Sequence, residues 1–150
     1  MMRQIAEFLA VLSCGLFAGA AIYVNLVEHP ARMECGVELA VTEFGPSYRR
    51  ATIMQASLAA LGFVCSMVAW AEGATFWWAI DGTMLGMVIP FTLIAMLPTN
   101  KKLVSAQPDR RSAETGELLA HWSALHAVRS LLSGLALLGF LYLLIFVEAR

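Results

Sequence analysis

Long apolar runs alternate with short polar segments along the chain, and this pattern predicts its elements. Four runs, at approximately 5–27, 53–71, 76–97 and 125–147, are long enough to cross a bilayer. A membrane span needs roughly 20 apolar residues in a helix, and none of the runs has the polar stripe of a surface helix. Backbone amides find no water in hydrocarbon, so each run should be helical. The pattern predicts an all-α fold, a membrane four-helix bundle.

The polar segment 28–52 between the first two runs has a helical pattern of its own. Val37, Val41 and Phe44 recur at i, i+4 and i+7, which is the spacing of one helix face. The dipeptide Gly45-Pro46 is a typical helix stop. We therefore expect a short amphipathic helix in the first loop, lying on the membrane surface.

Two further features predict local structure in the second half of the chain. Pro90 should kink the third span, because it removes a backbone hydrogen bond. The segment 98–124 should open with a turn at Pro98-Thr99-Asn100. A helix should then begin near Ser112 and continue into the fourth span.

The distribution of charge predicts the orientation in the membrane. Four spans place the two long loops on one side and both termini on the other. The long loops carry seven basic residues: Arg32, Arg49, Arg50, Lys101, Lys102, Arg110 and Arg111. The positive-inside rule then places both loops in the cytoplasm and both termini outside the cytoplasmic membrane. At the other side, Trp70, Trp77 and Trp78 should form an interfacial aromatic belt, and Asp81 should reach water by snorkelling.

Composition narrows the class of protein. The chain of 150 residues is 59% hydrophobic and 14% charged, whereas soluble domains are about 45–50% apolar and about 25% charged. We expect one integral membrane domain, 1–150, whose main partner is the lipid bilayer. The net charge of −1 gives no reason to expect nucleic acid. Three cysteines without a C-x-x-C pair argue against a disulfide framework or a thiolate zinc site. The sequence leaves the oligomeric state open.

Polar residues gather at the membrane face shared by the two long loops. The first cluster has the spacing i, i+3, i+4, i+7 of one helix face and consists of Asn25, Glu28, His29 and Arg32. The second lies at the start of the fourth span and consists of Trp122, His126 and Arg129. A charged residue at membrane depth usually faces the bundle interior with a partner. The expected partner of Arg129 is Glu28.

Three interpretations of these clusters stay open. Glu28 and Arg129 would form a structural clasp between the first and fourth spans. Alternatively, Glu28, His29, His126 and Arg129 would line a catalytic pocket, in which histidine or glutamate moves a proton and arginine binds an anionic or enolate oxygen. In a third, Glu28, His29 and His126 would supply the two-His, one-carboxylate ligands of a non-haem metal. Haem is less favoured, because the histidines lie near the membrane boundary.

Four strings of the sequence resemble one known family. They are VEHPAR (27–32), GPSYRRA (45–51), MLPTNKKL (96–103) and WSALHAVR (122–129). In this order they resemble the anthrone-oxygenase-like family of small membrane proteins. The resemblance covers essentially the whole chain and implies four membrane-spanning helices. The positions of family type are Glu28, His29, Arg32, Asn100, Trp122, His126 and Arg129.

The family takes its name from fungal members that oxidise an anthrone to an anthraquinone with molecular oxygen. The resemblance therefore implies a monooxygenase for a hydrophobic phenolic small molecule. His29 or His126 would remove an acidic C–H proton, and Arg129 would steady the enolate oxygen. Arg32, Asn100 and Trp122 would bind the substrate, with either no cofactor or a non-haem metal. The alternatives are a non-catalytic accessory or small-molecule-binding module with the Glu–Arg clasp and, less favoured, a proton-coupled transporter.

Overall fold

The computed structural model describes residues 1–105 and 110–147, and these form four long helical rods. The first rod comprises α1 (Met2–Tyr23), the π-helix η1 (Val24–Glu28) and α2 (His29–Glu34), and the second is α3 (Val37–Ala71). The third comprises α4 (Phe76–Gly86), α5 (Val88–Phe91), the π-helix η2 (Thr92–Met96) and α6 (Leu97–Ser105). The fourth comprises α7 (Ala113–Tyr142) and the π-helix η3 (Leu143–Val147). Each rod is long and apolar enough to cross a membrane, so the predicted all-α four-helix bundle is confirmed.

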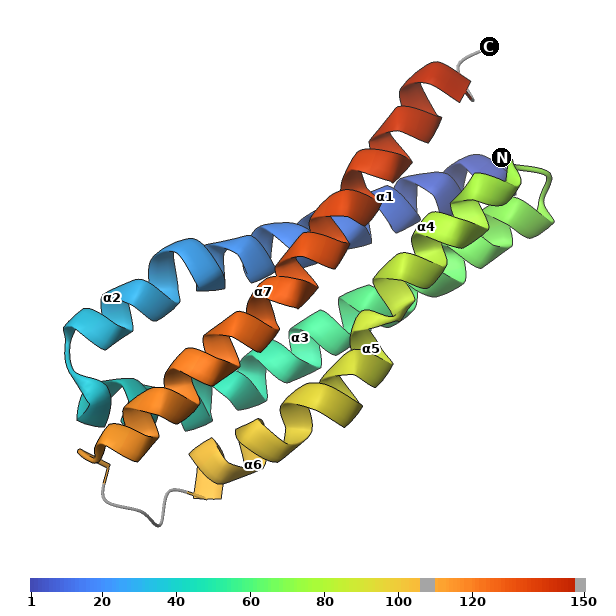
Figure 1. Cartoon of the computed structure of the whole chain (residues 1–150). Helices are drawn as coiled ribbons and strands as arrows, with labels where there is room; N and C mark the ends of the chain where they lie inside the picture. Colours follow the sequence, from blue (N-terminus) through green and yellow to red (C-terminus); the bar gives the residue numbers. More distant parts are fainter. Residues whose placement is uncertain (106–109, 148–150) are drawn as a thin grey trace.

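The rods run alternately up and down, so the start of α1 and the end of η3 lie at the same end of the bundle (Figure 1). We call this end, with the loop between α3 and α4, the terminal half of the bundle. The opposite end, with α2, the first part of α3, α6 and the first part of α7, is the loop half (Figure 1). The 35 residues of α3 make a helix about 52 Å long at about 1.5 Å per residue. Hydrocarbon is only about 30 Å thick, so several turns of α3 extend beyond it.

The first loop is much shorter than the sequence pattern suggested. Only Cys35 and Gly36 separate α2 from α3, and Gly36 has the positive φ of 96° that glycine tolerates. The segment from Val37 is helical as expected, but it forms the first turns of α3 and is not a separate helix. The stop expected at Gly45-Pro46 is wrong, because α3 continues through Pro46. Gly45 has no Cβ to clash with the proline ring, which reduces the cost of a helical residue before proline.

Two other prolines follow wide π turns. The His29 N–H donates to the carbonyl of Val24, and the Leu97 N–H donates to that of Thr92, five residues earlier in each case. Pro30 and Pro98 come directly after these donors. A proline ring clashes with the carbonyl four residues before it, and a wider turn relieves this clash. The turn expected at Pro98-Thr99-Asn100 is therefore wrong, because these residues belong to α6.

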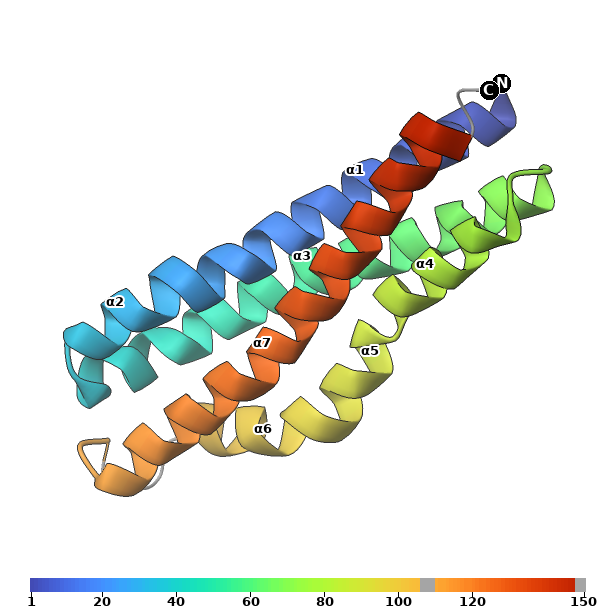
Figure 2. The ribbon, with the colours of Figure 1, turned by 45° about the horizontal axis from the view of Figure 1, so that its top comes forward.

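Two other local expectations are confirmed. The third rod is interrupted at Met87, three residues before Pro90, and the chain changes direction between α4 and α5 (Figure 2). The fourth rod begins where the sequence indicated, with Ser112 as its N-cap. The Ser112 side chain accepts a hydrogen bond of 3.2 Å from the Thr115 N–H, which stabilises a helix N-terminus.

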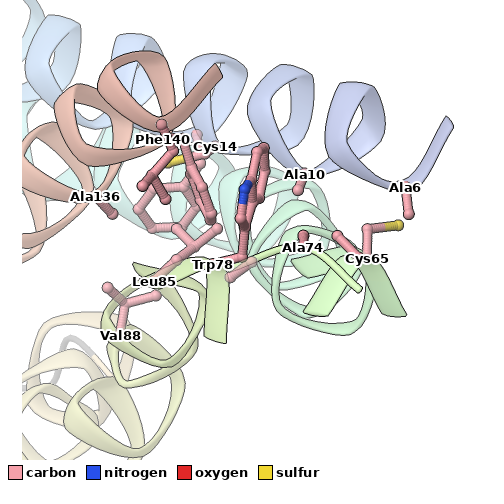
Figure 3. Close-up of a cluster of buried hydrophobic side chains, with 14 of the residues drawn as sticks. Ala6, Ala10, Cys14, Cys65, Ala74, Trp78, Leu85, Val88, Ala136 and Phe140 are labelled. Atoms are coloured by element: carbon pink, nitrogen blue, oxygen red, sulfur yellow. The ribbon is translucent and has the colours of Figure 1, made fainter. Parts of the chain in front are cut away.

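The terminal half has an apolar core made mainly of small and aromatic residues. Its buried cluster includes Ala10, Ala136 and Phe140, with the Trp78 ring standing among them (Figure 3). The ring centroids of Trp78 and Phe140 lie 5.2 Å apart. Trp70 and Trp77 are exposed as expected of an aromatic belt, but Trp78 is fully buried and belongs to the core.

Close helix contacts hold this terminal half together. A Cβ on Gly82 would collide with the Ser66 side chain of α3, and one on Gly139 would collide with the Asp81 carboxylate. Asp81 is consequently buried against α7, and the expectation that it snorkels to water is wrong. Small residues let the backbones approach closely, as in other membrane bundles.

Candidate functional site

A cavity of about 110 Å³ lies in the loop half of the bundle, next to the apolar core of the terminal half. All four rods contribute to its walls. The polar lining residues are Glu28, Arg32, Ser47, Tyr48, Thr52, Gln55, Thr92, Asn100, His126 and Arg129, together with the indole of Trp122. Between them stand apolar side chains such as Phe17, Val88 and Met96. Six of the seven residues that the sequence singled out for catalysis or binding therefore line one cavity.

Arg129 of α7 reaches across the cavity to α3. One guanidinium nitrogen donates to Gln55 Oε1 at 2.6 Å, and the other lies 3.9 Å from Met96 Sδ. The guanidinium carbon also lies 5.4 Å from the centroid of the Phe17 ring, which is close enough for a cation–π contact. Within residues 1–105 and 110–147, no carboxylate pairs with Arg129.

The expected pairing of Arg129 with Glu28 is therefore wrong. Glu28 forms its ion pair with Arg32, one helical turn away on the same rod, and accepts a 3.2 Å hydrogen bond from Ser47. Arg32 makes a second ion pair of 3.0 Å with Glu43. Residues at i and i+4 are neighbours on a helix, so the nearer arginine takes the carboxylate. Arg129 is left with neutral partners, although an unpaired charge in this environment is costly.

The imidazole of His126 is hydrogen-bonded to Asn25 of η1. The Nδ1 atom of His126 lies 2.8 Å from Asn25 Oδ1. The same oxygen accepts a 2.6 Å hydrogen bond from Ser130, and Asn25 Nδ2 donates to the Ser123 carbonyl at 3.1 Å. Asn25 itself does not line the cavity, whereas His126 does.

The two histidines of the predicted pocket occupy different positions. His29 is buried, and its ring centroid lies 5.4 Å from that of Trp122, but it does not line the cavity. The ring centroid of His126 lies 4.8 Å from that of the same indole, and His126 lines the cavity. The single face predicted for the cluster at residues 25–32 is also wrong. The wide turn of η1 directs Asn25 to α7, while Glu28 faces Ser47 of α3.

Several buried polar atoms on the cavity wall have no hydrogen-bond partner among the described residues. Asn100 is 1% exposed, and neither atom of its side-chain amide is paired. The Nε atoms of Arg32 and Arg129 and the indole nitrogen of Trp122 share this property. Buried polar groups are nearly always hydrogen-bonded, so these groups favour a polar ligand in the cavity.

The metal set of the third interpretation, Glu28, His29 and His126, is not assembled in the part of the chain that the structure describes. There, no group of three His, Cys, Asp or Glu side chains is close enough to hold an ion. Glu28 is engaged by Arg32, and His126 by Asn25. His29 does not reach the cavity wall that the other two occupy.

Gln55 and Ser130 are among the residues of the site that sequence reasoning missed. Gln55 binds Arg129, and an amide inside the otherwise apolar run 53–71 was the signal for it. Ser130 lies one residue after Arg129, where it reads as an ordinary small residue of a packed span. Tyr48 also lines the cavity, whereas the neighbouring Arg49 and Arg50 are exposed.

Comparisons with known proteins agree with this picture. The chain is 27% identical over 137 residues to the anthrone oxygenase tpcL of Aspergillus fumigatus, an alignment that covers 85% of each protein. No solved structure matches the chain. The family profile described as anthrone oxygenase matches residues 44–139, well over half of the chain. This integral membrane protein with four spanning helices belongs to the anthrone oxygenase family.

Proposed function

We propose that the protein is a membrane oxygenase that oxidises a hydrophobic, anthrone-like phenolic substrate with molecular oxygen. The observation that carries the proposal is the position of Arg129 on the same cavity wall as His126. Arg129 is a half-buried cation with a buried Nε atom, and it has no carboxylate partner in the described chain. Such a cation is suited to an oxygen that becomes anionic during the reaction. Membership of the family supports the same class of chemistry.

The first step is the removal of an acidic proton. An anthrone has a CH₂ group whose proton is acidified by a carbonyl across the ring. His126 accepts this proton, and the electron pair of the broken C–H bond moves to the carbonyl oxygen as an enolate. Arg129 binds that oxygen, with Gln55 holding the guanidinium in place from α3. The negative charge of the intermediate thus meets the positive charge that the fold leaves unpaired.

Molecular oxygen completes the oxidation. A C–O bond forms between the carbanion carbon and O₂, and protonation gives a hydroperoxide. Loss of the second C–H proton and cleavage of the O–O bond then yield the new carbonyl and water. The overall reaction, anthrone plus O₂ to anthraquinone plus H₂O, is balanced, and oxygen is the four-electron acceptor. Each round returns His126 to its neutral form.

The side walls of the cavity favour a substrate that arrives from the bilayer. Thr52 and Ala56 of α3 and Leu93 of η2 line the cavity, yet each is exposed on the outside of the bundle. The cavity is therefore open between α3 and η2. Its volume of about 110 Å³ is below the roughly 300–1,000 Å³ of typical ligand pockets. We propose that a flat substrate enters between these two elements and lies partly in the opening.

The remaining polar residues would bind the other end of the substrate. Asn100 and Trp122 offer unpaired hydrogen-bonding groups near the loop end of the cavity. Glu28 and Arg32, which form an ion pair, also line the cavity. A binding module without catalysis would have rested on the Glu28–Arg129 clasp, and Glu28 pairs with Arg32 instead. We also propose, from the distribution of basic residues, that the loop half faces the cytoplasm.

The proposal is tested with purified protein in lipid nanodiscs and a hydroxylated anthrone. We expect one O₂ consumed and one anthraquinone formed per anthrone, without hydrogen peroxide. Because anthrones oxidise slowly in air, the matched control is the Arg129→Met protein in the same lipid. Oxidation no faster than with this variant would contradict the proposed function.

A further inference from the structure

The network around Asn25 fixes the orientation of its own amide. Its Nδ2 atom lies 3.1 Å from the backbone carbonyl of Ser123. A carbonyl oxygen only accepts hydrogen bonds, so this side of the amide must be the donating NH₂ group. The amide oxygen then points to Ser130 and His126, at 2.6 and 2.8 Å. Both groups must donate to it.

This orientation decides which nitrogen of His126 carries hydrogen. The amide oxygen has no hydrogen to give, so the facing Nδ1 atom must be protonated. A neutral imidazole carries only one N–H, which leaves the lone pair on Nε2. Asn25 does not line the cavity, whereas His126 does. The bonded edge of the ring therefore faces η1, and Nε2 is the nitrogen left for the cavity.

We propose that Asn25 is a positioning residue, which holds His126 as the Nδ1–H tautomer and makes Nε2 the proton acceptor. The tautomer follows from hydrogen bonding alone, and only the use of Nε2 in proton removal rests on the proposed function. When the substrate C–H bond breaks, its electron pair stays on the substrate as the enolate, and the proton binds Nε2. The resulting imidazolium still donates Nδ1–H to Asn25, so the amide also stabilises the charged ring.

The wide turn of η1 is what makes this contact available. With regular α-helical spacing, Asn25 and Glu28 would share one face of the first rod. In the structure Asn25 contacts α7, and Glu28 lines the cavity and contacts α3. π turns inside helices are frequent at functional sites. Here the π turn separates Glu28, which lines the cavity, from Asn25, which is hydrogen-bonded to the proposed base His126.

The tautomer is measured directly by nitrogen NMR. The full-length protein is prepared in detergent micelles with ¹⁵N-labelled histidine rings, and the spectrum of a His126→Gln variant identifies the signals of His126. At a mildly alkaline pH we expect the Nε2 signal at the position of an unprotonated nitrogen and Nδ1 bonded to hydrogen. A protonated Nε2 in the wild-type protein would overturn the proposal.

Substitutions then connect the tautomer to the reaction. Asn25→Leu removes the acceptor at similar size, and we expect a mixture of tautomers and a fall in kcat of about 10- to 100-fold, with KM little changed. Asn25→Asp keeps an acceptor oxygen and should keep the Nδ1–H tautomer and most of the rate. Ser130→Ala removes only the second donor, so the tautomer should be retained.

The outcomes separate this proposal from the proposed function. A wild-type rate in Asn25→Leu, with the tautomer lost, would show that positioning by Asn25 does not serve the reaction. If Asn25→Leu fails to fold, rescue of rate and tautomer by Asn25→Asp still decides the point. An unprotonated Nε2 in a protein that oxidises no anthrone would support the tautomer and refute the function.

Discussion

The two halves of the bundle differ in how their interiors are filled. In the terminal half, small residues bring the helices together, and Trp78, Phe140 and Leu85 pack against one another in the core. In the loop half, the helices enclose a cavity on whose wall Asn100 and Arg129 keep unpaired polar atoms among the described residues. The first arrangement favours stability, and the second keeps binding groups ready for a ligand. Function and folding are therefore expected to respond to different substitutions.

The largest effect on activity should come from the base. His126→Gln removes the imidazole but keeps a side chain that can donate to Asn25. We expect oxidation of the anthrone to slow by about 10²- to 10⁴-fold, the usual contribution of general acid–base catalysis. Anthraquinone formation in nanodiscs measures the rate, and thermal unfolding checks that the bundle is intact. An unchanged rate would remove His126 from the mechanism.

Arg129 should show the contrast between binding and stability most clearly. Arg129→Met replaces a half-buried charge, which has no carboxylate partner among the described residues, by an apolar side chain of similar length. We expect the rate to fall by about 10²- to 10³-fold, as for the loss of an oxyanion donor. The melting temperature should stay equal or rise, because the variant no longer holds a half-buried charge without a carboxylate partner. A large loss of stability would show that Arg129 holds the bundle together.

A small side chain added in the terminal half should affect stability and leave the chemistry alone. Gly82→Ala places a methyl group against Ser66, and we expect a loss of about 1–3 kcal/mol from overpacking. Gly134→Ala is the control, since a Cβ at that position would meet no described atom within 4 Å apart from the adjacent residues and the nearby backbone of its own helix. It should be neutral or stabilising by up to about 1 kcal/mol, from helix propensity. Equal melting temperatures for the two variants would refute the close packing of α3 and α4.

The side opening of the cavity should give the smallest effect. Ala56→Leu narrows the gap between α3 and η2, and we expect KM to rise by several-fold with little change in melting temperature. Ala60→Leu adds the same side chain one turn further along α3, on an exposed residue that does not line the cavity. If both variants had the same KM, access between α3 and η2 would lose its support.

Hydrophobic pattern was enough to predict the spans, since twenty or so apolar residues in a row have few other structures available. The same pattern led to errors at the prolines. Pro46 and Pro98 lie inside helices, because a preceding glycine or a wide π turn removes the clash that normally ends them. Only the three-dimensional course of the backbone shows such relief.

Helix spacing, membrane topology and the family resemblance together indicated six of the residues that line the cavity, whereas His29 does not line it. They could not predict their partners, because a partner depends on the rotation of each rod. Glu28 forms its ion pair with Arg32. Arg129 binds Gln55 where Glu28 was expected. Asn25 is hydrogen-bonded to His126. The π turn of η1, which sets the last contact, leaves no sign in the hydrophobic pattern.

Binding of a hydroxylated anthraquinone tests most directly whether the loop half compensates a negative oxygen with Arg129. Such a compound changes colour when its phenol ionises, so its absorption spectrum reports the state of the bound molecule. At a pH where the free compound is neutral, we expect the wild-type protein to bind it as the phenolate, and Arg129→Met to bind it neutral or not at all. The same neutral spectrum with both proteins would contradict a charge-binding role for Arg129.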